Sequence, residues 1–423
     1  MSVGGTFLGG ASGRLLPAAI PLRYFGAAAA FHLLAWLALL VSADDLLAFR
    51  GGLGWPLAAL HLLTLGVFGM TALGAGAQLL PVATRQQPVG ANWLAWVWRA
   101  YAPGVAVLAA GMGLAQPAWI AVGAVPVVLA LAAWGILAAR HLWCARGMPG
   151  VVAHAWAALV SLFLLLATAL LLVAGWLGWQ APSRAVLVPL HLVLAPYGFM
   201  GLLSAGLAYV LVPMFALGEP PREAAQLTSG ALLALGILAA IGAILWPEAA
   251  GLGALAWAAG TTGVLLHLHL MRGVLASGLR RELGPSFTMV KSGWAALLAT
   301  LVFGGVLWTG LPVPHAPGWF ALALLAWLLG VVLGFMQRIL PFLASLHAAS
   351  GRRRGPTAAG LTDVKALKVH FRGHFAALAL LAGALAFDST WLVRAGALAG
   401  TVGAVGFALF YARLLARLRT TRP

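Results

Sequence analysis

The stretch HLLTLGVFGMTALGAGAQLLP, residues 61–81, contains one histidine and no Lys, Arg, Asp or Glu. Together with the preceding WPLAAL it makes an apolar run over 55–81. A helix needs roughly 20 apolar residues to cross the hydrocarbon layer of a bilayer, and this run exceeds that length. The sequence therefore predicts a transmembrane helix over 55–81.

The rest of the chain has the same character. Of its 423 residues, 63% are hydrophobic and 8% are charged, and the mean hydropathy is +1.00, which excludes an ordinary soluble protein. We therefore predict an all-α polytopic protein, a single integral membrane domain over 1–423. Twelve spans are expected, near 21–43, 55–81, 92–116, 118–140, 151–178, 185–217, 226–246, 250–276, 286–310, 317–345, 367–387 and 390–412.

The positive charge is distributed unevenly between the two ends of these spans. Only Arg50, Arg184 and Arg394 fall at one face, and the other 22 of the 25 Lys and Arg residues fall toward the opposite face. The positive-inside rule makes the basic face cytoplasmic, so both termini, including a tail over 1–20, and a basic loop over 346–366 are expected there. The net charge of +17 is explained by topology, and nucleic acid is not an expected partner.

A repeated pattern divides the spans into groups of four. The second, sixth and tenth spans end at Pro81, Pro213 and Pro341, each with a glycine seven residues earlier, and the intervals are 132 and 128 residues. We therefore predict three pseudosymmetric four-helix units. A transporter with two six-helix halves would repeat differently.

The ionisable residues within the spans are histidines rather than acids. All eight carboxylates fall in loops or at span ends, which argues against carboxylate-based proton pumping or ion coupling. The single Cys144 offers no disulfide and no paired thiol ligands. His61 and His191 are expected at similar depth in the outer third of the second and sixth spans, where two imidazoles could ligate a haem. Either one could instead bond a backbone carbonyl and pack.

A metal site is a second interpretation. His370 and His374 are spaced i and i+4, on one helical face, and His267 or His269 could complete the ligand set. Because residues two apart project about 200° from each other on a helix, only one of the latter pair is expected to face it. The alternative is that His370 and His374 are interfacial groups, and His141, His154, His315 and His347 are expected to be loop or span-end residues.

Arginines supply candidate partners for anionic groups. Arg50, Arg184 and Arg394 lie on the outer side and could bind the propionates of an outer-third haem. Arg99 and Arg338 lie deeper and need acceptors.

The second span resembles that of NnrS-like membrane proteins, which carry histidine, two glycines and proline at the spacing of His61, Gly66, Gly74 and Pro81. It is also similar to the helix of haem-copper oxidase subunit I in which that histidine ligates low-spin haem. GLAYVLVPMF in span 6 resembles an NnrS stretch, with weaker parallels in HLMR at 269–272 and GFMQR at 334–338. Both families have twelve helices, and the oxidase subunit has three-fold pseudosymmetry.

The differences from these families limit what the resemblance implies. NnrS proteins have His-x-His-Glu in span 2, whereas Ala59 and Leu62 flank His61 here. The adjacent histidine pair that oxidases use for copper is missing, and so is the His-x-His of their tenth span. The resemblance therefore implies one haem, of b type by our assignment, rather than a proton-pumping oxygen reductase, and copper is only a secondary candidate cofactor.

Three functions are compatible with the sequence. The leading one is a haem protein of the bacterial cytoplasmic membrane that handles electrons or a diatomic gas such as nitric oxide, acting as an oxidoreductase if it is an enzyme, with cytochrome or other respiratory subunits as candidate partners. The second is a cofactor-free transporter of a small neutral or hydrophobic substrate. The third is an accessory scaffold subunit of a respiratory complex.

Overall fold

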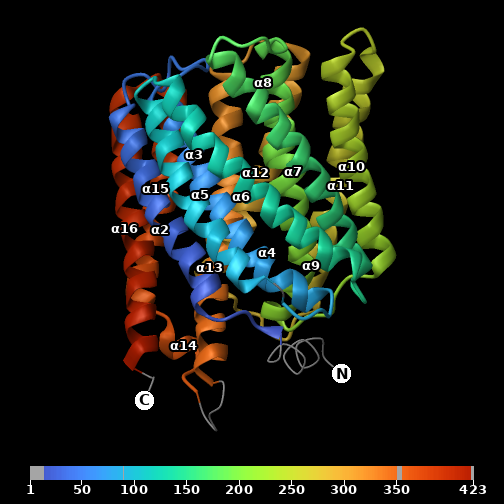
Figure 1. Cartoon of the computed structure of the whole chain (residues 1–423), viewed down its shortest axis with the longest axis vertical. Coiled ribbons are helices and arrows are strands. Elements are labelled where there is room, and N and C mark those ends of the chain that lie inside the picture. The colour runs from blue at the N-terminus through green and yellow to red at the C-terminus, as the bar shows by residue number, and fades with distance from the viewer. Residues whose placement is uncertain (1–13, 89, 350–354, 421–423) are drawn as a thin grey trace. The chain divides into compact units, whose positions relative to one another are not determined.

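The structure is a computed structural model that describes residues 14–88, 90–349 and 355–420 (Figure 1). Its described residues form helices and connecting segments, and they contain no strand. The elements are α2 (Ala19–Val41), α3 (Trp55–His61), η2 (Leu62–Gly69), α4 (Met70–Ala83), α5 (Ala91–Gly113), α6 (Pro117–Trp143), α7 (Pro149–Trp176), α8 (Arg184–Val193), η3 (Leu194–Gly201), α9 (Leu202–Ala216), α10 (Glu223–Leu245), α11 (Ala250–Ser277), α12 (Gly284–Thr309), α13 (Ala316–Ala349), α14 (Ala358–Leu361), α15 (Val364–Phe387) and α16 (Thr390–Thr420).

The all-α membrane architecture is confirmed. Counting α3–η2–α4 and α8–η3–α9 as one helical segment each, the twelve long segments coincide with the twelve expected runs. Eleven of them, among the described residues, are long and apolar enough to span a membrane. The exception is α5, whose 23 residues include Arg99, Asn92 and Pro103. The expected loop over 346–366 is partly helical, because α13 continues to Ala349 and α14 lies within it. Residues 1–13 of the expected tail lie outside the described residues.

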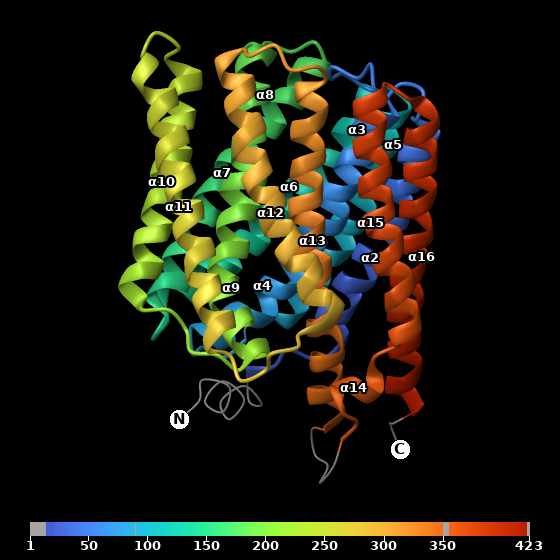
Figure 2. The ribbon, with the colours of Figure 1, turned by 180° about the vertical axis from the view of Figure 1, so that it is seen from behind.

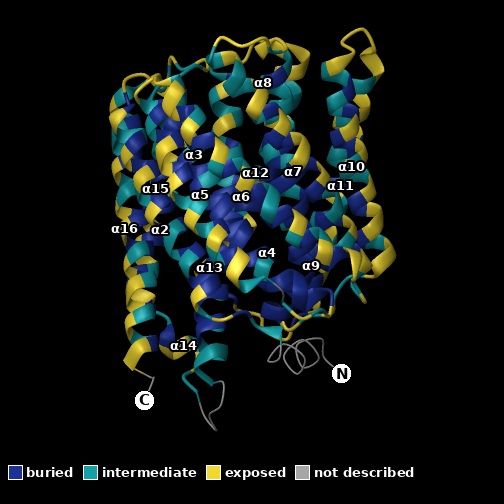
Figure 3. Ribbon diagram, viewed as in Figure 1, coloured by how far each residue is buried: buried dark blue, intermediate teal, exposed yellow. Residues whose placement is uncertain are grey.

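Large apolar side chains are exposed along the helices, as a lipid-facing surface requires. Figure 3 shows exposed residues over the full length of several helices and not only at their ends. Val122, Leu129 and Leu238 are 66%, 64% and 63% exposed. In water such a surface would be a liability, whereas in lipid it has no cost. The chain is therefore a multi-pass membrane protein.

Contacts divide the chain into two compact units, which are described separately. Unit 1 comprises Met1–Leu15, Ala75–Val97 and Val128–Leu283, and unit 2 comprises Leu16–Gly74, Trp98–Val127 and Gly284–Pro423. In unit 1, α10 packs along α11, and in unit 2 the antiparallel pairs are α12 with α13 and α15 with α16 (Figure 2).

Two π-helices occupy equivalent positions in the second and sixth spans. η2 covers Leu62–Gly69 and η3 covers Leu194–Gly201. Pro81 and Pro213 are 132 residues apart. The same shift in residue number aligns η2 with η3 residue for residue. π-Helical turns are rare and are frequent at functional sites. In the tenth span, α13 is a continuous α-helix, so this feature belongs to the first two repeats.

The repeated glycines have one structural role in all three groups of four. Each allows the second helix of its group to approach the first helix of that group. A Cβ added at Gly74 would lie 2.8 Å from Tyr24 Cβ on α2, one at Gly206 2.7 Å from His154 Cβ on α7, and one at Gly334 2.7 Å from the Ser286 carbonyl oxygen on α12. This shared contact supports the division into groups of four, although the compact units number two.

Within unit 2, α2 and α16 run antiparallel. Tyr411 on α16 donates a hydrogen bond of 2.7 Å to the carbonyl oxygen of Leu22, near the start of α2. At the other end, Arg394 pairs with Asp44, just after α2. The start of α2 and the end of α16 therefore lie at the same end of unit 2, as an even number of crossings requires.

Candidate functional site

His61 lies at the junction between α3 and η2. Gly54 is the residue before α3, and Pro56 lies in the first turn of this helix. A proline is tolerated there because the backbone N–H groups of the first turn have no partner within the helix. His61 Nδ1 lies 3.0 Å from the Leu57 carbonyl oxygen, and it donates because a carbonyl only accepts. The side chain is half-buried. A backbone carbonyl that holds one ring nitrogen is the usual support of a histidine that ligates a metal through the other.

His191 lies two residues before the end of α8. Ser183 caps this helix by accepting a hydrogen bond from the Ala185 backbone N–H. His191 Nδ1 is 3.5 Å from Thr168 Oγ1 on α7, and its side chain is half-buried. It therefore stands beside η3, as His61 stands beside η2.

The two histidines are not equivalent positions of the repeat. The 132-residue interval aligns His191 with Ala59, and it aligns His61 with Val193. His61 belongs to unit 2 and His191 to unit 1. Each histidine lies next to the π-helix of its own unit. Ligation of one haem by both histidines stays a prediction.

The three arginines that were expected on the outer side, Arg50, Arg184 and Arg394, have partners of their own. Arg394 Nη2 contacts both carboxylate oxygens of Asp44, at 2.8 and 2.7 Å, and its guanidinium lies over the Trp391 ring. Arg184 lies over Trp176, with 4.9 Å to the ring centroid. Arg50 donates to the carbonyl oxygens of Leu47 and Phe49. A propionate at Arg394 would have to share the guanidinium with a carboxylate.

Of the two deeper arginines, Arg338 on α13 has a polar partner on the neighbouring helix. Its Nε donates a hydrogen bond of 2.8 Å to Ser286 Oγ on α12. Arg99 on α5 is exposed.

His267 and His269 point in different directions, as predicted. His267 is 4% exposed, whereas His269 is exposed. His267 Nδ1 is 3.1 Å from the Tyr209 hydroxyl oxygen, and the Tyr209 ring packs between His267 and His154, with centroid distances of 5.3 and 5.4 Å.

His154 lies near the start of its span, as expected, but it is enclosed by other helices. It lies six residues into α7 and is fully buried. Gly230 and Gly206 leave the space for its ring and its Cβ. No local sequence pattern predicts this cluster, because Tyr209 and both histidines come from three different helices.

His370 and His374 are buried in unit 2. Their exposed fractions are 0% and 3%, so the alternative that they are interfacial surface groups was wrong. The residue that meets them is His32 from the middle of α2, 1% exposed, with its ring centroid 5.8 Å from that of His370. No sequence pattern connects His32 with these two histidines. Among the described residues, no three or more His, Cys, Asp or Glu side chains are arranged to hold a metal ion.

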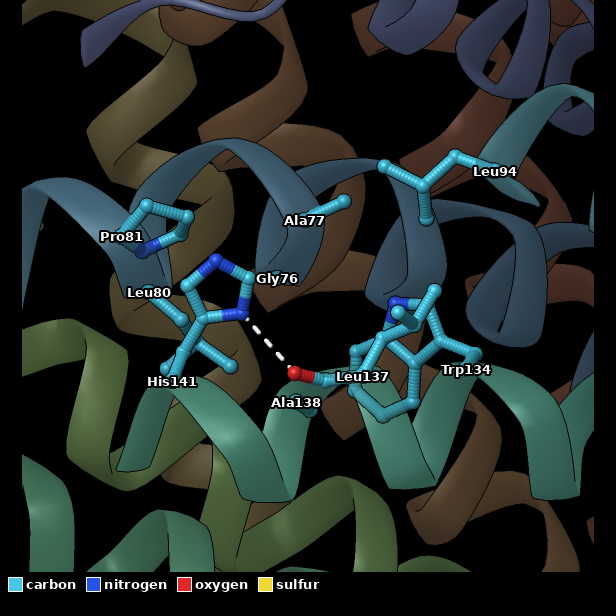
Figure 4. Close-up of a pocket in the computed structure, with 9 residues that line it drawn as sticks. All are labelled: Gly76, Ala77, Leu80, Pro81, Leu94, Trp134, Leu137, Ala138 and His141. Carbon is cyan, nitrogen blue, oxygen red and sulfur yellow. Dashed lines mark hydrogen bonds between the residues drawn. The ribbon is translucent and has the colours of Figure 1, made fainter. Parts of the chain in front are cut away.

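A pocket in unit 1 is lined almost entirely by apolar side chains of α4, α5 and α6 (Figure 4). Its lining residues are Gly76, Ala77, Leu80, Pro81, Leu94, Trp134, Leu137, Ala138 and His141. His141 Nδ1 donates to the Leu137 carbonyl oxygen at 2.8 Å. His141 and the indole of Trp134 carry the polar side-chain atoms of this lining.

Comparison of the sequence with protein-family models and with curated proteins finds no match.

Proposed function

We propose that this chain is a haem-binding protein of the NnrS or haem-copper oxidase subunit I type in the bacterial cytoplasmic membrane. It handles electrons or a diatomic gas such as nitric oxide, and it is not a proton-pumping oxygen reductase. Both termini face the cytoplasm, and cytochrome or other respiratory subunits are its candidate partners. When bound, a haem supplies one-electron and gas-binding chemistry.

The observation that carries the proposal is the position of His61 and His191 beside η2 and η3. Two eight-residue π-helices at the same place in two repeats support a functional role, because π-helical turns are rare and are frequent at functional sites. In each case a half-buried histidine lies at the start of the segment or within three residues of it.

The chemistry of the donors fits a haem ligand. The Leu57 carbonyl directs the proton of His61 to Nδ1, which makes Nε2 the nitrogen with the lone pair. Among the described residues, no carboxylate lies within a long helix near His61, since Asp44 and the other acids lie at helix ends or in loops. A neutral imidazole also costs less in lipid than a charged ligand.

The test is the visible spectrum of the full-length protein purified after haem-replete expression. We expect a Soret band and a reduced-minus-oxidised difference spectrum, and we expect His61→Ala or His191→Ala to change both. His269→Ala is the matched control, because this histidine lies on a membrane helix and is exposed. A colourless folded protein, or a spectrum unchanged in both test variants, would refute the proposal and favour a cofactor-free role.

A further inference from the structure

The pocket between α4, α5 and α6 lies near one end of the helices of unit 1. His141 and Arg140 are in the last turn of α6, and Pro81 is two residues before the end of α4. Trp134 precedes His141 by seven residues on the same helix, so it lies about 10 Å further into the span. The pocket therefore extends from the helix ends into the membrane-spanning part of unit 1.

Small side chains on α4 and α6 leave the space for this pocket. Gly76 and Ala77 line it from α4, and Ala138 lines it from α6. A Cβ added at Gly76 would lie 2.6 Å from the Trp134 ring. The pocket and its opening hold about 280 Å³ of empty space, just below the range of about 300 to 1,000 Å³ that is usual for whole small molecules. It therefore suits one segment of a larger molecule.

His141 supplies a buried polar atom to the pocket. Its side chain is 7% exposed, and its Nδ1 donates to the Leu137 carbonyl oxygen at 2.8 Å, so Nε2 carries the lone pair. Among the described residues, this Nε2 has no hydrogen-bond partner. Figure 4 shows the ring between Pro81 and Gly76, with its second nitrogen directed toward α4. Because a buried acceptor without a donor is costly, the pocket suits a ligand that carries a hydroxyl group.

Arg85, Arg140 and Arg146 lie at the same end of unit 1, and all three are exposed. The Arg146 backbone N–H donates to the Thr84 carbonyl oxygen at 3.1 Å, which holds the connection after α6 against the connection after α4. Within the described part of the chain, none of the ion pairs involves these three arginines. The opening of the pocket is therefore flanked by positive charge that is available to an anionic group.

Exposed tryptophans mark this end as the membrane interface. Trp93 and Trp96, which flank Leu94 in the sequence of α5, are 65% and 63% exposed, and Trp143 at the end of α6 is 83% exposed. Tryptophan is enriched at the level of the lipid headgroups. The opening therefore lies at headgroup level, and the apolar wall around Trp134 lies at the level of the acyl chains.

We propose that this pocket binds a phospholipid with an anionic, hydroxyl-bearing headgroup, of the phosphatidylglycerol class. The phosphate pairs with the exposed arginines, a headgroup hydroxyl donates to His141 Nε2, and one acyl chain packs against Trp134. The site goes beyond the proposed function, because it uses neither His61 nor His191.

The chemistry of the opening distinguishes this class from other membrane lipids. Phosphatidylethanolamine would bring an ammonium group beside three cations, and it has no net negative charge to offset them. Diacylglycerol has a hydroxyl group but no phosphate for the arginines. Only an anionic lipid with a headgroup hydroxyl uses both the basic residues, which attract anionic lipids, and the buried acceptor of His141.

The test titrates the delipidated full-length protein in detergent with three lipids of one acyl composition, namely phosphatidylglycerol, phosphatidylethanolamine and diacylglycerol. Native mass spectrometry measures the affinity of the first bound lipid. We expect one saturable site for phosphatidylglycerol, with at least about tenfold weaker binding of the other two lipids.

Variants assign the binding to this pocket. Arg140→Gln should weaken phosphatidylglycerol binding about fivefold, through the loss of one basic residue, and His141→Phe, which removes the acceptor and keeps a ring, about threefold or more. Arg272→Gln is the matched control, because Arg272 is also an exposed arginine of unit 1 but is on α11 and does not line the pocket. Ala77→Leu narrows the pocket from a half-buried position and should also weaken binding.

The thermal midpoint of each variant shows that it is folded. Equal affinities for phosphatidylglycerol and phosphatidylethanolamine, or unchanged phosphatidylglycerol binding in folded Arg140→Gln and Ala77→Leu, would overturn the proposal. Displacement of the lipid by glycerol phosphate alone would also overturn it, since the acyl chain would then contribute nothing. A Soret band is read from the same samples, so phosphatidylglycerol binding without haem would refute the proposed function and leave this site standing.

Discussion

Trp36 donates a hydrogen bond of 3.0 Å from its indole Nε1 to His32 Nε2, one helical turn earlier on α2. Both side chains are buried, at 2% and 1% exposure. The bond sets the tautomer of His32 and holds its ring toward His370 on α15. A tryptophan in the first span thus orients a polar group that faces the eleventh span.

We expect Trp36→Phe to destabilise the protein. The substitution leaves His32 Nε2 buried without a donor and removes part of a packed ring, so the loss should be about 1 to 3 kcal/mol. The measurement is the thermal or denaturant midpoint in detergent. Trp179→Phe, at a side chain that is 68% exposed, is the control and should change the midpoint little. Equal stability of the two variants would contradict the structural role of this bond.

Gly400 on α16 faces the Trp36 ring directly, and a Cβ added there would overlap it. We expect Gly400→Ala to cost about 1 to 3 kcal/mol, as overpacking of a filled core does. Gly273→Ala is the control, because a Cβ at this glycine of α11 meets nothing within 4 Å, and it should be neutral or slightly stabilising. A midpoint of Gly400→Ala that matches the control would mean that α2 and α16 are further apart.

Tyr101 supports the π-helix beside His61. Its hydroxyl donates to the Leu65 carbonyl oxygen of η2 at 3.0 Å, and its side chain is fully buried. Tyr101→Phe should cost about 1 to 3 kcal/mol by leaving that carbonyl without its donor. If His61 ligates a haem, the same variant should also shift the Soret band, because the π-helix sets the position of His61. A shifted Soret band in Tyr101→Phe together with an unchanged Soret band in His61→Ala would contradict an effect of the π-helix through His61.

Asp363 caps α15 and should make stability depend on acid pH. It accepts from the Ala366 backbone N–H at 2.9 Å and pairs with Arg413 at 2.9 Å and Arg417 at 3.4 Å. The Ala366 N–H, followed by the Arg413 side chain, lowers the pKa of this carboxyl below its ordinary value of 3.8. A lowered pKa means that the stabilisation is complete above 3.8 and is lost as the pH falls through the lower folded-state value.

We therefore expect Asp363→Ala to cost about 0.5 to 2 kcal/mol at neutral pH, the usual range for a lost cap. The difference from the unsubstituted protein should shrink on acidification below pH 3.8. Asp363→Asn, which keeps a capping oxygen but no charge, should fall between the two. Unfolding midpoints measured from pH 7 downward check this prediction. A difference between Asp363→Ala and the unsubstituted protein that does not change with pH would contradict a contribution from the Asp363 charge.

The single cysteine is a native probe of topology. Cys144 is exposed just after α6, and the positive-inside rule places this connection in the cytoplasm. A membrane-impermeant maleimide should label it in inside-out vesicles and not in right-side-out vesicles. Gln180→Cys in a Cys144→Ser background, in the exposed connection between α7 and α8, should give the opposite result. Reversed labelling of both would invert the proposed orientation.

The helical spans and their ends could be predicted from the sequence, because each depends on local properties. Hydropathy marks the runs, and the absence of acids within them follows from the cost of burying charge in lipid. The opposite directions of His267 and His269 follow from the helical period. The glycines before Pro81, Pro213 and Pro341 predicted a repeat of four helices. In the structure, each of these glycines lies against the first helix of its group.

Only the tertiary structure decided which histidines meet. His32 joins His370 and His374, and Tyr209 joins His154 and His267, through contacts between helices far apart in the chain. Periodicity specifies a direction from a helix axis but not the neighbour in that direction, and the neighbour depends on how α2, α15 and α16 pack. The tertiary structure also decided where the two π-helices form, because their backbone hydrogen bonding depends on partners from other helices, such as Tyr101. The sequence determined a multi-pass helical membrane protein rich in intramembrane histidine, and packing determined the groups in which those histidines can act.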